Sequence, residues 1–167
     1  MKKSIVLLLS LVIISCSQQP SQECQTLTLE NTNLNKNLVT YVSAWEAVFE
    51  KRDINLINTD SFDAQATVVT AQGDVEGIDA FRAYYNNYLT GFSDAEFKFI
   101  DVFGQGDKIV KHWNFKGTHD GELFGIPATN NKVDLSGTTL VWMKDGKVIK
   151  EQDFFDNHSF LTQLGLL

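Results

Sequence analysis

The sequence has few cysteines, few histidines and a deficit of basic side chains. It contains two Cys and three His among 167 residues. The histidines have no nearby cysteine and form no HExxH motif, so the ligand spacing of a zinc site is absent. With 14 Lys and Arg against 21 Asp and Glu, the net charge is −7. This acidic balance disfavours nucleic acid and anionic lipid surfaces as partners.

Long apolar runs and glycine-rich phosphate loops are also missing. The longest apolar stretch covers residues 5–14, well below the about 20 residues that a membrane-spanning helix needs. Gly104 and Gly106 precede a predicted strand and not a helix, which excludes a phosphate-binding loop there.

The remaining composition is that of one globular domain. Hydrophobic residues make up 43% of the chain, and the aromatic residues include 12 Phe, 4 Tyr and 3 Trp. These rings can fill a core or line a cavity, and composition does not distinguish the two.

Residues 1–15 have the pattern of a secretory signal peptide. Lys2 and Lys3 precede the apolar run, and the small residue Ser15 precedes Cys16. The segment resembles a bacterial lipoprotein signal, in which Cys16 is lipidated and becomes the first residue after cleavage. The resemblance implies an exported protein held by a lipid anchor on the periplasmic or cell-surface side. The alternative is an ordinary secretory signal with an incidental cysteine.

The next segment, residues 16–31, is rich in Ser, Gln and Thr and lacks apolar periodicity. It predicts a flexible tether between the anchor and a folded domain over residues 32–167. With Cys16 lipidated, Cys24 has no partner for a disulfide.

The first half of the domain has mainly helical periodicity. An apolar stripe at spacings of three and four predicts a long helix over residues 34–52. A short helix is expected over 53–58, a strand over 67–71 and a third helix over 77–89. The residues of this third helix expected to face inward are Ile78, Phe81, Tyr85 and Tyr88.

From residue 96 onward the apolar period is two, which is typical of strands. Strands are expected over 96–103, 108–118, 133–144 and 147–156, and Asp145-Gly146 between the last two predicts a hairpin. Helices followed by antiparallel strands predict an α+β domain. A bent sheet wrapped around the long helix would enclose a cone-shaped cavity. The expected shared faces are Phe97, Phe99 and Phe103; Ile109, Trp113 and Phe115; and Val110, His112 and Asn114.

Two C-terminal segments carry a family resemblance. Residues 117–129, Gly-Thr-His-Asp-Gly-Glu-Leu-Phe-Gly-Ile-Pro-Ala-Thr, resemble the GxHxGxxxGxPxT segment of the SnoaL-like polyketide cyclases, also called ester cyclases. Residues 145–149, Asp153, Asp156 and residues 163–165 follow in that family's order and spacing. The resemblance implies the cystatin-like cone shared with nuclear transport factor 2 and ketosteroid isomerase.

The resemblance also implies a catalytic acid. In these cyclases an Asp on the last strand is the general acid/base of an intramolecular aldol ring closure, without metal or cofactor, and Asp153 has its position. A carboxylate facing an aromatic cavity loses hydration and can exchange protons near neutral pH. Asp156, at the end of the same strand, is expected to cap the C-terminal segment.

The sequence departs from the family beside this acid. The cyclases carry His where this chain has Glu151 and Thr139. A one-residue bulge at the hairpin glycine would place Thr139 opposite Glu151. Two neighbouring carboxylates would favour protonation of one of them, which either makes a working acid or marks a site that lost the cyclase reaction. Alternation alone does not decide whether the face with Glu151 and Asp153 or the face with Phe154 looks inward.

Two histidines are further candidates. His119 matches the family's own His, either as a catalytic hydrogen-bond donor at the pocket rim or as a residue that fixes the turn. His112 lies mid-strand and could point into the cavity beside Asn114. The remaining candidates for lining the cavity are Tyr41, Trp45, Tyr85, Phe99, Trp113, Ile126 and Thr139.

These observations leave three functions open. One is a cofactor-free cyclase or isomerase acting on an apolar carbonyl compound through Asp153, with Glu151 and His119 as further catalytic candidates. Another is non-catalytic binding of a small apolar ligand. The third is a homodimer formed through an exposed sheet face carrying Phe97 and Phe99.

Overall fold

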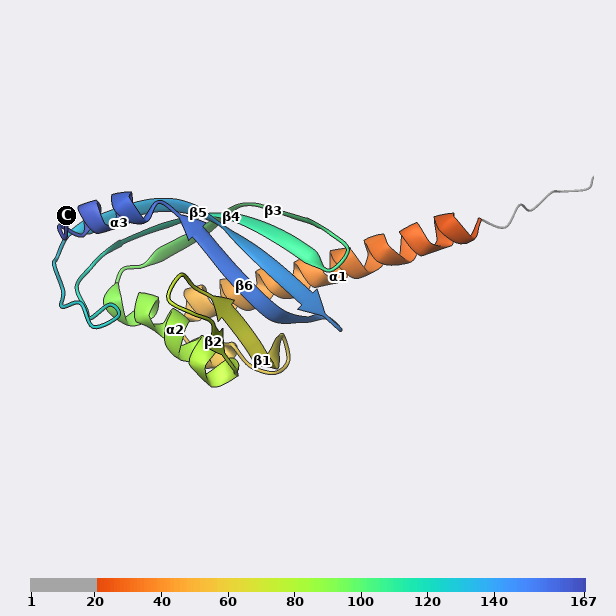
Figure 1. The fold of residues 1–167 in the computed structure, drawn as a ribbon, viewed down its shortest axis with the longest axis horizontal. Coiled ribbons are helices and arrows are strands. Elements are labelled where there is room, and N and C mark those ends of the chain that lie inside the picture. The colour runs from red at the N-terminus through yellow and green to blue at the C-terminus, as the bar shows by residue number, and fades with distance from the viewer. Residues whose placement is uncertain (1–20) are drawn as a thin grey trace, which may run out of the picture.

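The computed structural model describes residues 21–167 (Figure 1). The predicted signal sequence, Cys16 and the start of the predicted tether lie outside the described residues. Among residues 21–167, no helix combines the length and apolarity needed to cross a bilayer.

The first helix is longer than its apolar stripe. α1 spans Gln22–Lys51, and the side chain of Ser21 caps it by accepting a hydrogen bond from the backbone N–H of Cys24. Residues 22–31, expected in a flexible tether, are therefore helical, although all of them are exposed. Adding turns to an existing helix needs no apolar contact, because only the first turn carries the cost of nucleation. In Figure 1 these turns project away from the rest of the domain.

Four elements follow α1 before the long strands begin. They comprise the 3₁₀ helix η1 (Ile54–Leu56), the strands β1 (Phe62–Val69) and β2 (Val75–Glu76), and the helix α2 (Ile78–Gly91). β1 begins five residues before the predicted start. α2 buries Phe81, Tyr85 and Leu89, which recur every four residues on the face toward the sheet.

Four long strands and a short helix complete the chain: β3 (Glu96–Gln105), β4 (Lys108–Thr118), β5 (Lys132–Lys144), β6 (Lys147–Phe155) and α3 (Asn157–Gln163). The six strands have the order β2-β1-β6-β5-β4-β3. The predicted α+β class is confirmed. The sheet is mixed and not wholly antiparallel, because β1 pairs with β6 in parallel.

The core lies between the curved sheet and the helices α1 and α2 (Figure 1). Tyr41, Trp45 and Val48 of α1 are at most 1% exposed and pack against Phe62, Phe81 and other buried residues of one cluster. A second cluster, around Phe92, Trp113 and Phe115, continues this core toward α3.

A bulge in β3 changes which aromatic rings face inward. Phe99 pairs with Trp113, but the next pair is Asp101 with His112, so Ile100 is an extra residue. Phe103 was expected beside Phe97 and Phe99; the bulge turns it outward, where it is 54% exposed.

The same geometry corrects the expected dimer surface. Phe97 and Phe99 are partly buried and pack against the two core clusters, so they do not form an exposed apolar face. The large apolar side chains that are exposed on β3, β5 and β6 are Ile100, Phe103, Leu140 and Phe154.

Candidate functional site

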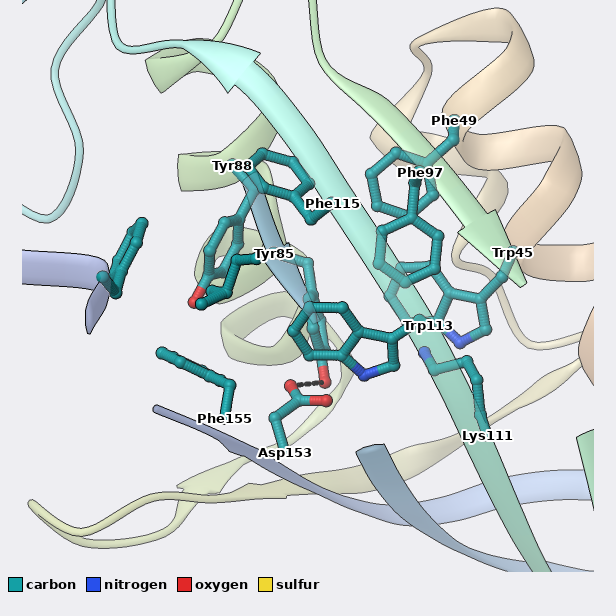
Figure 2. A pocket seen from close by; sticks show the side chains of 12 residues that line it. Trp45, Phe49, Tyr85, Tyr88, Phe97, Lys111, Trp113, Phe115, Asp153 and Phe155 are labelled. Atoms are coloured by element: carbon teal, nitrogen blue, oxygen red, sulfur yellow. Dashed lines mark hydrogen bonds between the residues drawn. The ribbon is translucent and has the colours of Figure 1, made fainter. Parts of the chain in front are cut away.

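Two cavities adjoin each other inside the cone. The inner cavity has a volume of about 40 Å³ and is lined mainly by aromatic rings of α1, α2, β3, β4 and β6 (Figure 2). The outer pocket has a volume of about 780 Å³ and lies between α2, β1, β6, α3 and the loop before β5. Both are lined by Tyr88, Asp153, Phe155 and Phe160.

The structure decides which face of β6 looks inward. Glu151 is fully buried, and Asp153 and Phe155 line the inner cavity, while Phe154 on the opposite face is 47% exposed. Asp153, the acid implied by the family resemblance, therefore lies at the boundary of the two cavities.

Thr139 lies opposite Asp153. The predicted pairing of Thr139 with Glu151 is therefore wrong. The pairs Met143–Val148 and Trp142–Lys150 place the bulge at Ile149 of β6, so the extra residue is on β6 and not at the hairpin glycine. The Thr139 hydroxyl donates a hydrogen bond of 2.5 Å to Oδ1 of Asp153. It accepts one of 3.0 Å from the indole N–H of Trp113.

Glu151 is the more deeply buried carboxyl of the site. Its Oε1 accepts a hydrogen bond of 2.8 Å from the indole N–H of Trp45, and its Oε2 accepts one of 2.7 Å from Tyr85. Burial raises the pKa of Glu151, the charge of Lys111 opposes this rise, and the charge of Asp153 adds to it. The hydrogen bonds from Tyr85 and Trp45 also lower this pKa, but burial outweighs them and the net shift is upward.

The hydroxyl of Tyr85 joins the two carboxyls. It lies 2.7 Å from Oε2 of Glu151. It lies 3.0 Å from Oδ2 of Asp153 (Figure 2). Burial raises the pKa of Tyr85 well above its ordinary value, so the hydroxyl keeps its proton. Because a phenol has only one proton to donate, Tyr85 donates to one carboxyl at a time. A protonated Glu151 can donate to Tyr85, which then donates to Asp153.

Lys111 is a site residue that the sequence analysis missed. It lines the inner cavity and is 2% exposed. Its Nζ lies between 4.9 and 5.8 Å from the ring centroids of Tyr41, Trp45, Phe97 and Phe99. The signal was present, because Lys111 alternates with Ile109, Trp113 and Phe115 on one face of β4.

His119 lies away from both cavities. It is fully buried in the loop before β5, where Nδ1 accepts a hydrogen bond from the backbone N–H of Thr129. Its backbone also bonds to Asn130 and Asn131. Burial lowers its pKa, which favours the neutral ring that such an acceptor requires. The arrangement matches the turn-fixing alternative and not a hydrogen-bond donor at the rim.

His112 does not point into the cavity. It lies on the outer face of the sheet, paired with Asp101 and Thr138, because Lys111 and Trp113 on either side of it face inward. Asp156 caps α3 by accepting a hydrogen bond from the backbone N–H of Ser159, as expected.

Four of the predicted lining residues line one of the two cavities, and three line neither. Trp45, Tyr85 and Trp113 line the inner cavity, and Ile126 lines the outer pocket. Phe99 lies beside Lys111 in the core, and Thr139 and Tyr41 are fully buried behind the lining. In the part of the chain that the structure describes, no three His, Cys, Asp or Glu side chains gather as metal ligands would.

This arrangement is suited to proton transfer on an apolar molecule. The carboxylate of Asp153 faces two apolar cavities, its orientation is set by Thr139 and Tyr85, and a second carboxyl lies behind Tyr85. A carboxylate fixed in this way can accept a proton from a bound molecule and return it.

Comparisons with known proteins agree with this fold. A protein from Jannaschia sp. CCS1, assigned as a SnoaL-like polyketide cyclase, shares 23% identity with a TM-score of 0.73, over 80% of this chain and 94% of that one. TsrD from Streptomyces laurentii shares 21% identity with a TM-score of 0.70, over 78% and 96%. TerC, co-crystallised with polyporic acid, shares 18% identity with a TM-score of 0.63, over 78% and 98%. No curated protein matches the sequence.

The family itself is settled by the sequence. The family model for the SnoaL-like polyketide cyclases matches residues 39–164, which is most of the folded domain. This chain belongs to the SnoaL-like polyketide cyclase family.

Proposed function

We propose that this protein is an enzyme that transfers a proton on a small apolar carbonyl compound, with Asp153 as general acid/base. The observation that carries the proposal is the position of Asp153. Among the described residues, it is the only carboxyl side chain that lines both the inner cavity and the outer pocket. An apolar substrate in the outer pocket would present its carbonyl end to this carboxylate.

The chemistry follows from the site. Asp153 removes a proton from the carbon next to the carbonyl group, and it later returns a proton to the product oxygen or carbon. The hydrogen bonds from Thr139 and Tyr85 keep the carboxylate in one orientation, so little reorganisation is needed in the transition state. For a substrate with two carbonyl groups, the same steps give an aldol ring closure.

The test is proton exchange, which needs no knowledge of the natural product. The full chain is incubated in D₂O with a panel of small cyclic ketones and diketones, and NMR follows deuterium uptake beside the carbonyl. We expect exchange above the buffer rate for some compounds, and its loss in Asp153→Asn. Asp156→Asn is the matched control, because Asn also caps a helix. Equal exchange in Asp153→Asn and the unmodified chain would refute the proposal.

Ligand binding without chemistry is the second candidate function. It is favoured by the large apolar outer pocket and by the neighbour TerC, which was co-crystallised with polyporic acid. This candidate predicts that apolar hydroxyquinones bind equally well to the unmodified chain and to Asp153→Asn, with no exchange above the buffer rate in either.

We further propose that the protein is exported and anchored through Cys16. The pattern of residues 1–16 supports this, and the exposed turns of α1 over residues 22–31 provide a spacer of about 15 Å at 1.5 Å per residue. Incorporation of labelled fatty acid in cells expressing the full chain, and its loss in Cys16→Ala with Cys24→Ala as the control, tests the anchor.

A further inference from the structure

The amine of Lys111 is enclosed by aromatic rings. Tyr41 and Trp45 of α1 and Phe97 and Phe99 of β3 surround Nζ, with ring centroids 4.9 to 5.8 Å away. Among the described residues, no carboxylate oxygen lies within the 4.0 Å of an ion pair with Lys111. A lysine that only balanced a buried acid would be expected to contact it.

Burial favours the uncharged amine, whereas the faces of the four rings favour the charged one. Burial lowers the pKa of Lys111, and the charges of Glu151 and Asp153 on β6 oppose this effect. A protonated Glu151 carries no charge and then no longer raises the pKa of Lys111. Burial raises the pKa of Glu151 and so makes this form more accessible. The remaining titratable groups nearby, Tyr41 on α1 and Tyr85 on α2, keep their protons because burial raises both of their pKa values. A desolvated neutral lysine is a nucleophile toward carbonyl carbon.

Lys111 shares its cavity with the acid/base. Both Lys111 and Asp153 line the inner cavity, whose volume of about 40 Å³ suits a carbonyl group or a water and not a whole ligand (Figure 2). The bulk of a ligand would lie in the outer pocket, on the other side of Tyr88, Asp153 and Phe155. The carbonyl carbon could thus approach the amine while its oxygen remains near a proton donor.

We propose that Lys111 forms an imine with aldehydes or unhindered ketones that enter the inner cavity. The inference takes its carbonyl class of substrate from the proposed function and goes beyond it in the bond that forms. The amine nitrogen adds to the carbonyl carbon, and the oxygen gains a proton as the nitrogen loses one, which gives a carbinolamine. The C–O bond then breaks, water leaves with a proton delivered by Asp153, and loss of the remaining N–H proton leaves a neutral C=N bond.

The test is reductive trapping on the full chain. The protein is incubated at pH 7 with acetaldehyde and sodium cyanoborohydride, and peptide mass spectrometry follows ethylation of every lysine over time. The matched control within the same sample is Lys98, whose side chain on neighbouring β3 is 69% exposed. Because burial lowers the pKa of Lys111, a larger fraction of its amine is unprotonated, so we expect Lys111 to be modified several-fold faster than Lys98 despite its burial.

Variants separate the possible outcomes. Lys111→Arg keeps the cation but cannot form an imine, and it should abolish only the rapid phase. Lys98→Met should leave the rapid phase unchanged. If Lys111 is modified no faster than Lys98 in the folded protein, and reacts only in guanidinium, the proposal is wrong. Asp153→Asn should slow but not abolish labelling, so its loss of ketone proton exchange can be judged separately from imine formation.

Discussion

Thr139 and Asp153 are cross-strand partners, and the hydroxyl of Thr139 donates a hydrogen bond of 2.5 Å to the carboxylate of Asp153. The same hydroxyl accepts a hydrogen bond from the indole of Trp113, which is part of the second core cluster. Through Thr139, the orientation of the proposed acid/base is tied to the packing of the core and not to a mobile loop.

Replacing the hydroxyl of Thr139 should lower the stability of the protein. Thr139→Val keeps the shape but leaves the buried N–H of Trp113 without an acceptor, which we expect to lower the free energy of unfolding by about 1–3 kcal/mol. Urea denaturation followed by tryptophan fluorescence measures it. Thr138→Val on the outer face is the control and should change stability by less than about 0.5 kcal/mol. Equal losses in the two variants would show that the hydrogen-bonded chain is unimportant.

Glu151 should make stability depend on pH. Its pKa in the folded state is raised above the reference value of 4.5, so the folded state binds this proton more tightly than the unfolded state. The contribution of the protonated group is fully present below pH 4.5 and is lost as pH rises through the folded-state pKa. Glu151→Gln lacks this titration, so its free energy of unfolding relative to the unmodified protein should rise with pH over that window.

Urea denaturation across the pH range tests this dependence. Glu46→Gln, at an exposed position of α1, is the matched control and should give a constant difference from the unmodified protein. Parallel curves for Glu151→Gln and the unmodified protein would contradict the prediction.

Gly137 should not tolerate a methyl group. A Cβ there would collide with the ring of Trp113 and would lie 2.7 Å from the carbonyl oxygen of Phe154. Gly137→Ala is therefore expected to lower the free energy of unfolding by about 1–3 kcal/mol and to shift the fluorescence of Trp113. Gly91→Ala provides the comparison, because its nearest neighbour is the Leu123 side chain at 3.2 Å, which can yield; its cost should be clearly smaller.

His119 should matter for folding and not for chemistry. His119→Leu removes the acceptor for the backbone N–H of Thr129, and we expect a loss of about 1–3 kcal/mol in the free energy of unfolding. Ketone exchange per folded molecule should be unchanged. His112→Leu, on the outer face, should affect neither quantity by a measurable amount. Loss of exchange in fully folded His119→Leu would return this residue to the site.

Much of the fold and part of the site follow from residue patterns. The switch from helical to strand periodicity near residue 96 predicted the α+β class, and Asp145-Gly146 predicted the last hairpin. The residues around His119 and Asp153 indicated the family and its acid. These features are local, because periodicity and turn chemistry act over a few residues.

Register and depth of burial could not be read in this way. The bulges at Ile100 and Ile149 add one residue to one strand, which turned Phe103 outward and paired Thr139 with Asp153. No propensity marks these positions, because a bulge forms where the two strands and the layer beneath them fit best.

The sequence by itself determined the order of helices and strands, the membership of the family and the presence of a carboxylate on the last strand. Only the tertiary structure decided that Glu151 and Lys111 lie in the core beside Asp153. Alternation states which residues share a face, but α1 and α2 determine which face is removed from water. Burial by those helices raises the pKa of Glu151 and lowers that of Lys111, which no pattern of neighbouring residues could show.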